Sequence, residues 1–130
     1  MALKINLRPH ERLIVGGAVV ANGDSRCTLL IENTVPILRE KDILGEKNAD
    51  SPCKRIYFVI QLMYVDEKKL TDHITLYWKL IADVANAAPS TLPLIEQINE
   101  LIVAGKYYQA LKKSKKLIEY EQEVLNRARN

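Results

Sequence analysis

The spacing of the hydrophobic residues changes near residue 45, and this change limits the folds open to the chain. Between Leu3 and Leu44 apolar residues alternate with polar ones, or form short runs separated by Gly, Asn and Pro, as is typical of short β-strands. From Ser51 onward they recur every three or four positions, as is typical of amphipathic helices. The sequence therefore predicts an α+β chain, with a small antiparallel β-unit at residues 1–45 and a bundle of about four helices at residues 51–130.

Short strands and tight turns are expected throughout the β-unit. Residues 3–8 alternate between apolar and polar, as in a half-buried strand. Gly16-Gly17 permits a turn or bulge, and Asn22-Gly23 is the strongest hairpin signal, because a type I′ turn needs positive φ at both central residues. A last strand is expected from Pro36 to Ile43. Since most of about five strands would pair with a sequence neighbour, we expect an antiparallel meander or a small barrel.

Helix boundaries in the second unit are marked by capping residues. Ser51 followed by Pro52 predicts a helix start, and the apolar character continues nearly all round the helix to about Val65. Further helices are predicted at about 71–85, from a cap at Ser90 or Thr91 to about 104, and at about 106–127. Gly105 is expected to end the third of them in a left-handed conformation.

Composition and charge restrict the partners of the chain. The 130 residues carry a net charge of +3, and the pI is about 8.8. The first 45 residues hold six Lys/Arg against five Asp/Glu, and the remainder holds thirteen against eleven. A nucleic-acid site must therefore be a local patch on a mildly basic protein.

No catalytic, cofactor or metal site is predicted. His10 and His73 are the only histidines, and both are expected to be structural. Cys27 and Cys53 lack a CxxC partner, so both are expected to be reduced thiols. The carboxylates are scattered among lysines and are expected to form solvated surface. The sequence therefore favours a binding protein over an enzyme.

No membrane or secretion signal is predicted either. The longest apolar run, Ile56–Val65, spans about ten residues, which is too short to cross a bilayer as a helix. No long apolar segment follows Lys4, as it would in a signal peptide. We therefore expect a soluble, cytoplasmic protein without membrane contact.

Basic residues on the first and last strands form the main candidate site. On the last strand Arg39 and Lys41 alternate with apolar neighbours, which sends both side chains to one face. On the first strand Lys4, Asn6 and Arg8 also share a face. If these two strands are adjacent, in one chain or across a dimer, they form a basic stripe that can contact phosphate or a guanine edge. The alternative is that these are ordinary exposed strand residues.

A secondary basic patch is expected on the last helix. Lys112 and Lys116 lie four residues apart and Lys113 and Lys116 three apart, so the three share a helix face. Together with Lys106 they could meet phosphates or an acidic partner. The alternative is a solvated face whose charge is balanced by Glu119, Glu121 and Glu123.

Several segments closely resemble the FlbT family, the flagellum biosynthesis repressors of alphaproteobacteria. They are LKINLRPHERLIVGGAVV at 3–20, Asn22-Gly23-Asp24, Ile31-Glu32-Asn33 and LREKDIL at 38–44. The resemblance runs along the full chain. One departure is His10, which stands before Glu11 where the family pattern has glycine.

This resemblance implies a post-transcriptional regulator that acts on the 5′ untranslated region of flagellin mRNA and promotes decay of that mRNA. The N-terminal third is also similar to the carbon-storage regulator CsrA, through Val15-Gly16 and the Arg39–Ile43 segment. In CsrA proteins the first and last strands of opposite subunits pair, RNA binds along those edges, and the arginine matching Arg39 is a main contact. The resemblance thus implies RNA contacts at Arg39, Arg8, Lys4 and Lys41, and a possible homodimer through the β-unit. Leu7 departs from the pattern, because CsrA has a basic residue there.

A protein-binding module is the alternative. The helical part would then hold flagellin or another flagellar assembly factor, and the β-unit would be structural. The mild net charge favours this alternative, as does the absence from the sequence of the exposed aromatic–basic interleaving typical of single-strand RNA readers. The two hypotheses differ in salt dependence, since a phosphate-driven complex weakens steeply as salt rises.

Overall fold

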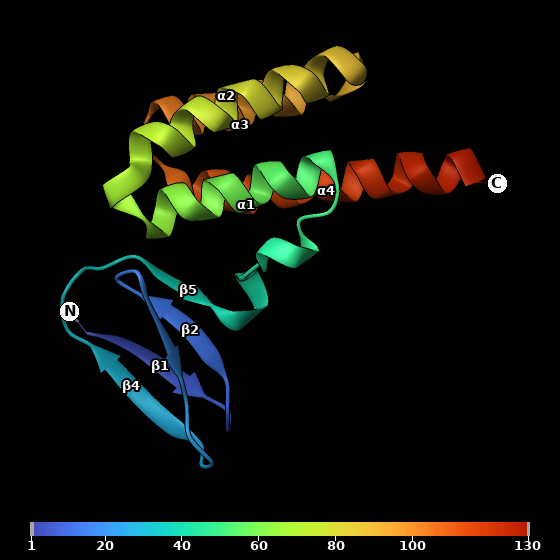
Figure 1. The fold of residues 1–130 in the computed structure, drawn as a ribbon. Helices are drawn as coiled ribbons and strands as arrows, with labels where there is room; N and C mark the ends of the chain where they lie inside the picture. Colours follow the sequence, from blue (N-terminus) through green and yellow to red (C-terminus); the bar gives the residue numbers. More distant parts are fainter. Residues whose placement is uncertain (1, 130) are drawn as a thin grey trace. The chain divides into compact units, whose positions relative to one another are not determined.

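The computed structural model describes residues 2–129 and shows an α+β chain, as the sequence predicts (Figure 1). The chain divides between Ile43 and Leu44 into two compact units. Strands make up the first unit and four α-helices make up the second. Within residues 2–129, none of the helices combines the length and the apolar character needed to cross a membrane.

The β-unit contains five strands in two antiparallel sheets. They are β1 (Leu3–Leu7), β2 (Arg12–Val15), β3 (Ala18–Ala21), β4 (Cys27–Ile31) and β5 (Ile37–Arg39). β1 pairs with β4, and β2 lies between β3 and β5. Only β2 and β3 are sequence neighbours that pair, so the expected meander is wrong. The β1–β4 and β2–β5 pairings join strands that lie further apart in the sequence, and they bring apolar faces together. Local turn signals carry no information about such pairings.

The hairpin forms at Gly16-Gly17 and not at Asn22-Gly23. Gly16 and Gly17 have φ of 57° and 86°, as a two-residue type I′ turn between β2 and β3 requires. The hairpin expected at Asn22-Gly23 is wrong, because β3 and β4 do not pair. The Asn22 amide instead donates to the carbonyl oxygens of Arg8 and Ser25, at 2.7 and 2.9 Å. Asn22 therefore holds its loop against Arg8, the residue that follows β1.

The core of the β-unit follows from the alternation in β1. Ile5 and Leu7 are buried together with Leu13 of β2, whereas Lys4 and Asn6 are exposed. Partly buried apolar residues surround these three: Val15, Val20, Cys27, Leu29, Ile31 and Ile37. Burying one such aliphatic side chain contributes about 1.5–3 kcal/mol. This small core fixes the two sheets against each other and so fixes the end of β1, where the candidate site lies.

The last strand is shorter than the sequence suggests. β5 ends at Arg39, and Glu40–Asp42 form a 3₁₀ turn that is closed by the Ile43 N–H donating to the Glu40 carbonyl at 3.1 Å. The expected strand from Pro36 to Ile43 is therefore wrong beyond Arg39. Lys41 lies on the turn, so strand alternation does not relate it to Arg39.

The helical unit contains α1 (Pro52–Val65), α2 (Leu70–Ala87), α3 (Leu92–Val103) and α4 (Tyr107–Arg129). Short 3₁₀ turns lie at 46–48, at 67–69 (η3) and at 89–91 (η4). The bounds lie within a turn of those predicted. Ser51 caps α1 by accepting the Lys54 N–H at 3.2 Å, as expected. Gly105, at φ 73°, ends α3, and the Lys106 N–H donates to the Leu101 carbonyl at 2.8 Å.

α1 is central to the packing of this unit. It contacts both α2 and α4, and α3 also packs on α4 (Figure 1). Its nearly all-round apolar character is explained by this position, and Ile56 and Ile60 are fully buried. The predicted stripes on α2 and α3 supply the facing core residues: Tyr77, Ile81, Val84, Ile95, Ile98 and Ile102. The helices therefore form the bundle that the sequence predicts.

Candidate nucleic-acid interface in the β-unit

The loop between β1 and β2 is a tight turn that requires a left-handed residue. The Glu11 N–H donates to the Arg8 carbonyl at 3.1 Å, and His10 has φ of 63°. Proline at the second position and positive φ at the third are the features of a type II turn, which favours glycine at the third position. His10 therefore adopts a conformation that glycine would adopt with less strain.

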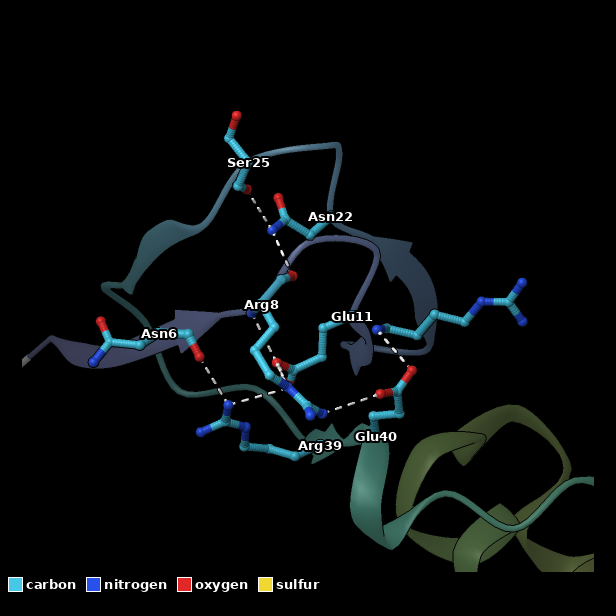
Figure 2. Close-up of polar contacts among 8 residues, drawn as sticks. Asn6, Arg8, Glu11, Asn22, Ser25, Arg39 and Glu40 are labelled. Carbon is cyan, nitrogen blue, oxygen red and sulfur yellow. Dashed lines mark hydrogen bonds and ion pairs between the residues drawn. The ribbon is translucent and has the colours of Figure 1, made fainter.

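This turn places the Glu11 carboxylate at the centre of the site, where only 6% of its surface is exposed. Oε1 accepts the Arg8 backbone N–H at 2.9 Å and Arg8 Nε at 3.3 Å. Oε2 accepts Arg39 Nη2 at 3.2 Å (Figure 2). The expectation that the carboxylates form solvated surface is wrong for Glu11. The signal available in the sequence was its position three residues after Arg8, across a proline turn.

The pKa of Glu11 is lowered to about 2. The largest cause is the Arg8 backbone N–H, and the guanidinium groups of Arg39 and Arg8 lower the pKa further, while burial opposes them. Glu11 therefore stays ionised at neutral pH and holds two arginines in place.

Arg39 connects β5 to β1, although these strands do not pair. Its Nη2 donates to the Asn6 carbonyl at 2.9 Å as well as to Glu11 (Figure 2). Neither of these bonds uses Nη1 or Nε. The Arg39 side chain is 41% exposed, so it is fixed by the protein and still reaches solvent.

Glu40 pairs more weakly with the same site. Its Oε2 lies 3.5 Å from Arg8 Nη2, and its Oε1 accepts the Arg12 N–H at 3.2 Å. The side chains of Arg8 and Glu40 are 67% and 43% exposed. An exposed pair of this kind contributes about 0–1 kcal/mol, so an incoming anion can displace it.

A pocket of about 340 Å³ opens over these groups, and its lining consists of Asn6, Arg8, Glu11, Arg39 and Lys41. The structure thus brings together three of the four predicted contacts, Arg8, Arg39 and Lys41. Lys4 lies elsewhere on the exposed side of β1, opposite Leu30 of β4. All five lining residues belong to one chain, so the pocket does not require a second copy. We call it the arginine pocket.

The secondary patch on α4 has a different character from the one expected. Lys112 and Lys113 are half-buried, and Lys116 is exposed. The Lys112 ammonium lies 5.2 Å from the centroid of the Tyr108 ring. Glu121 does not belong to a solvated balancing face, because its carboxylate accepts from the Ser51 hydroxyl and from the Cys53 N–H, the latter at 3.1 Å.

The histidines and the acidic groups show no metal-binding arrangement in the part of the chain that the structure describes. His10 Nε2 lies 3.2 Å from Asp24, and His73 Nε2 lies 3.1 Å from Asp66. These are pairs of one histidine and one carboxylate.

Comparison with known proteins gives matches along most of the chain. The family model "Flagellar protein FlbT" matches residues 3–125. The "Probable flagellum biosynthesis repressor protein FlbT 1" of Bradyrhizobium diazoefficiens is 49% identical over 125 residues, covering 95% of this chain and 85% of the relative. The "Probable flagellum biosynthesis repressor protein FlbT" of Rhodopseudomonas palustris is 40% identical and covers 98% of this chain and 100% of the relative. The "Flagellum biosynthesis repressor protein FlbT" of Caulobacter vibrioides is also 40% identical, over 96% of this chain and 90% of the relative. No solved structure was found to match the chain.

Proposed function

The chain belongs to the FlbT family of flagellar proteins, and from this membership we propose that it represses flagellum biosynthesis by binding the 5′ untranslated leader of flagellin mRNA. Cellular nucleases would degrade the bound mRNA, so the protein itself performs no reaction. It acts in the cytoplasm. The observation that supports this proposal is the arginine pocket, where Arg8, Arg39 and Lys41 line one opening.

Arg39 is the proposed main contact because it is held in place before RNA binds. The Asn6 carbonyl and Glu11 bind only Nη2 of its guanidinium. Nη1 and Nε point in different directions, so each can donate separately to a phosphate oxygen or to an acceptor atom of a base. Because the rotamer is already fixed, less side-chain entropy is lost on binding.

Lys41 and Arg8 supply phosphate contacts on either side of Arg39, and Lys4 extends the contact surface along β1. Each lysine acts as a flexible point charge, while Arg8 exchanges its weak bond with Glu40 for a phosphate. The three basic residues of the pocket, Arg8, Arg39 and Lys41, predict a logarithmic salt slope of about −2 for single-stranded RNA, so affinity falls about twenty-fold between 50 and 200 mM salt.

The test is a titration of a flagellin 5′ leader with the full chain at these two salt concentrations. Arg39→Ala is expected to weaken binding about ten- to hundred-fold, the loss typical of hydrogen bonds to a charged group. Arg26→Ala is the matched control, because Arg26 is exposed in the same unit and lies outside the pocket lining. Equal affinity of the two variants would contradict the assignment of Arg39.

A second candidate function is binding of an apolar segment of flagellin or of another flagellar assembly protein. A pocket of about 350 Å³ between the start of α1, the end of α2 and α4 favours it. Its lining includes Val84, Ala87, Val124 and Leu125, and the last two are each 45% exposed. Flagellin titrated in parallel separates the candidates: binding of flagellin without binding of the leader, little changed by salt, would favour the protein partner.

A further inference from the structure

The first half of α4 carries a concentrated positive charge. Between Lys106 and Ile118 there are five lysines and no carboxylate, and the first acidic residue is Glu119. The acidic residues Glu119, Glu121 and Glu123 follow in the second half. This half of the helix therefore presents a cationic surface.

Two tyrosines from distant parts of the sequence meet on this surface. α1 and α4 run antiparallel, because Cys53 at the start of α1 contacts Glu121, whereas Tyr64 near the end of α1 contacts Tyr108. The Tyr64 and Tyr108 rings lie 5.4 Å apart with an angle of 43° between their planes. Tyr108 is 40% exposed, and Tyr64 is half-buried.

Lysines lie on the same helix face as Tyr108. Lys112 and Lys116 follow it at successive intervals of four residues, and the Lys112 ammonium lies over the Tyr108 ring. Lys106 is exposed at the start of α4, and η3, which directly follows α1, adds exposed Lys68 and Lys69. We call the set Tyr64, Tyr108, Lys106, Lys112 and Lys116 the tyrosine–lysine surface.

We propose that the tyrosine–lysine surface is a second binding site for single-stranded RNA. A base stacks on Tyr108 in place of the Lys112 ammonium, with Tyr64 supporting the ring, and Lys106 and Lys116 contact the flanking phosphates. Aromatic rings between cations are the arrangement by which proteins hold unpaired nucleotides without reading their sequence. An acidic protein segment would use the lysines but gains little from an exposed tyrosine ring, so the ring contact favours RNA.

This inference rests on the proposed function and changes what it predicts about the leader. A leader that reaches both units is held by the arginine pocket and by the tyrosine–lysine surface, and it dissociates only when both are released. The arginine pocket would supply the base-specific contact, and the tyrosine–lysine surface would add affinity for any unpaired stretch.

The test uses the full chain with two RNAs, the flagellin leader and an unstructured oligouridine. Tyr108→Leu keeps an apolar side chain against Tyr64 but removes the stacking ring, and it is expected to weaken binding of both RNAs about five- to thirty-fold. Tyr108→Phe keeps the ring and is expected to bind like wild type. Lys116→Gln is expected to make the salt slope shallower by about 0.7. Arg127→Gln, on the exposed far end of α4, is the charge control and should change neither the affinity nor the salt slope.

The outcomes separate this inference from the proposed function. Leader binding that Arg39→Ala weakens and Tyr108→Leu leaves intact keeps the arginine pocket and overturns the tyrosine–lysine surface. Leader binding that Tyr108→Leu weakens and Arg39→Ala leaves intact supports the tyrosine–lysine surface and overturns the arginine pocket. A loss with Lys116→Gln but not with Tyr108→Leu shows attraction of charge alone and overturns the stacking role. If wild type does not bind the leader, the proposed function fails. Oligouridine binding then decides the inference: a loss in Tyr108→Leu supports the tyrosine–lysine surface, and no loss overturns it.

Discussion

Removing the negative charge of Glu40 should tighten RNA binding. Glu40 lies 3.5 Å from Arg8 Nη2, so a phosphate bound to Arg8 would lie about 6 Å from the Glu40 carboxylate. Two like charges at that distance in water repel by about 0.7 kcal/mol, and screening at low salt reduces the repulsion to about 0.5 kcal/mol. Glu40→Gln should therefore bind the leader about two- to threefold more tightly at 50 mM salt. The glutamine oxygen can still accept the Arg12 N–H, so the 3₁₀ turn should be preserved.

The assay is a competition of wild type and Glu40→Gln for one labelled leader. Glu32→Gln provides the control, because it makes the same charge change at an exposed position outside the pocket lining. The gain should shrink towards onefold at about 500 mM salt, where the Debye length falls below the separation of the charges. A Glu40→Gln variant that binds no better than Glu32→Gln at low salt would refute the placement of phosphate beside Arg8.

Two further predictions concern the stability of the β-unit. Glu11 has a pKa of about 2 in the folded chain, below its ordinary value of 4.5, so its stabilising effect is present above about pH 4.5 and is lost as the pH falls towards 2. Glu11→Gln should lack this loss: the protection factors of amides in β1 and β2, which correct for the intrinsic exchange rate at each pH, should fall less between pH 4.5 and 2 than in wild type. An equal fall in the two proteins would contradict the network. His10 has φ of 63°, so the β-unit of His10→Gly should be about 1 kcal/mol more stable than that of His10→Ala. Hydrogen-exchange protection measures the difference, and a more stable His10→Ala would contradict the turn.

The helical unit could be predicted from the sequence because its signals are local. The cap at Ser51, the glycine at 105 and the apolar stripes all act within a few residues, and the structure places each of them as expected. The β-unit could be predicted only in part. Gly16-Gly17 and Asn22-Gly23 are both valid turn signals, and the choice between them depends on which strands pair across the unit.

The candidate site shows the same division between local and distant causes. Arg8, Arg39 and Lys41 line one pocket as the sequence suggested, but Lys41 does so from a turn and not from a strand. The contact of Glu11 with Arg8 is local, but its contact with Arg39 comes from the other end of the β-unit, so spacing alone could not reveal that second contact. The contact of Tyr64 with Tyr108 likewise requires the antiparallel packing of α1 on α4.

Glu11 and Glu40 carry the same charge and both contact Arg8, yet we expect opposite effects from their removal. Glu11 is buried and binds Arg39 and two groups of Arg8, so removing its charge frees the guanidinium groups to adopt many rotamers. Glu40 is half-exposed and holds Arg8 at 3.5 Å, so removing its charge mainly removes repulsion. If net charge alone governed RNA binding, both substitutions would increase affinity by similar factors. If the preset geometry of Arg39 governs it, Glu11→Gln lowers affinity while Glu40→Gln raises it, and this difference in sign identifies which property governs the proposed RNA binding.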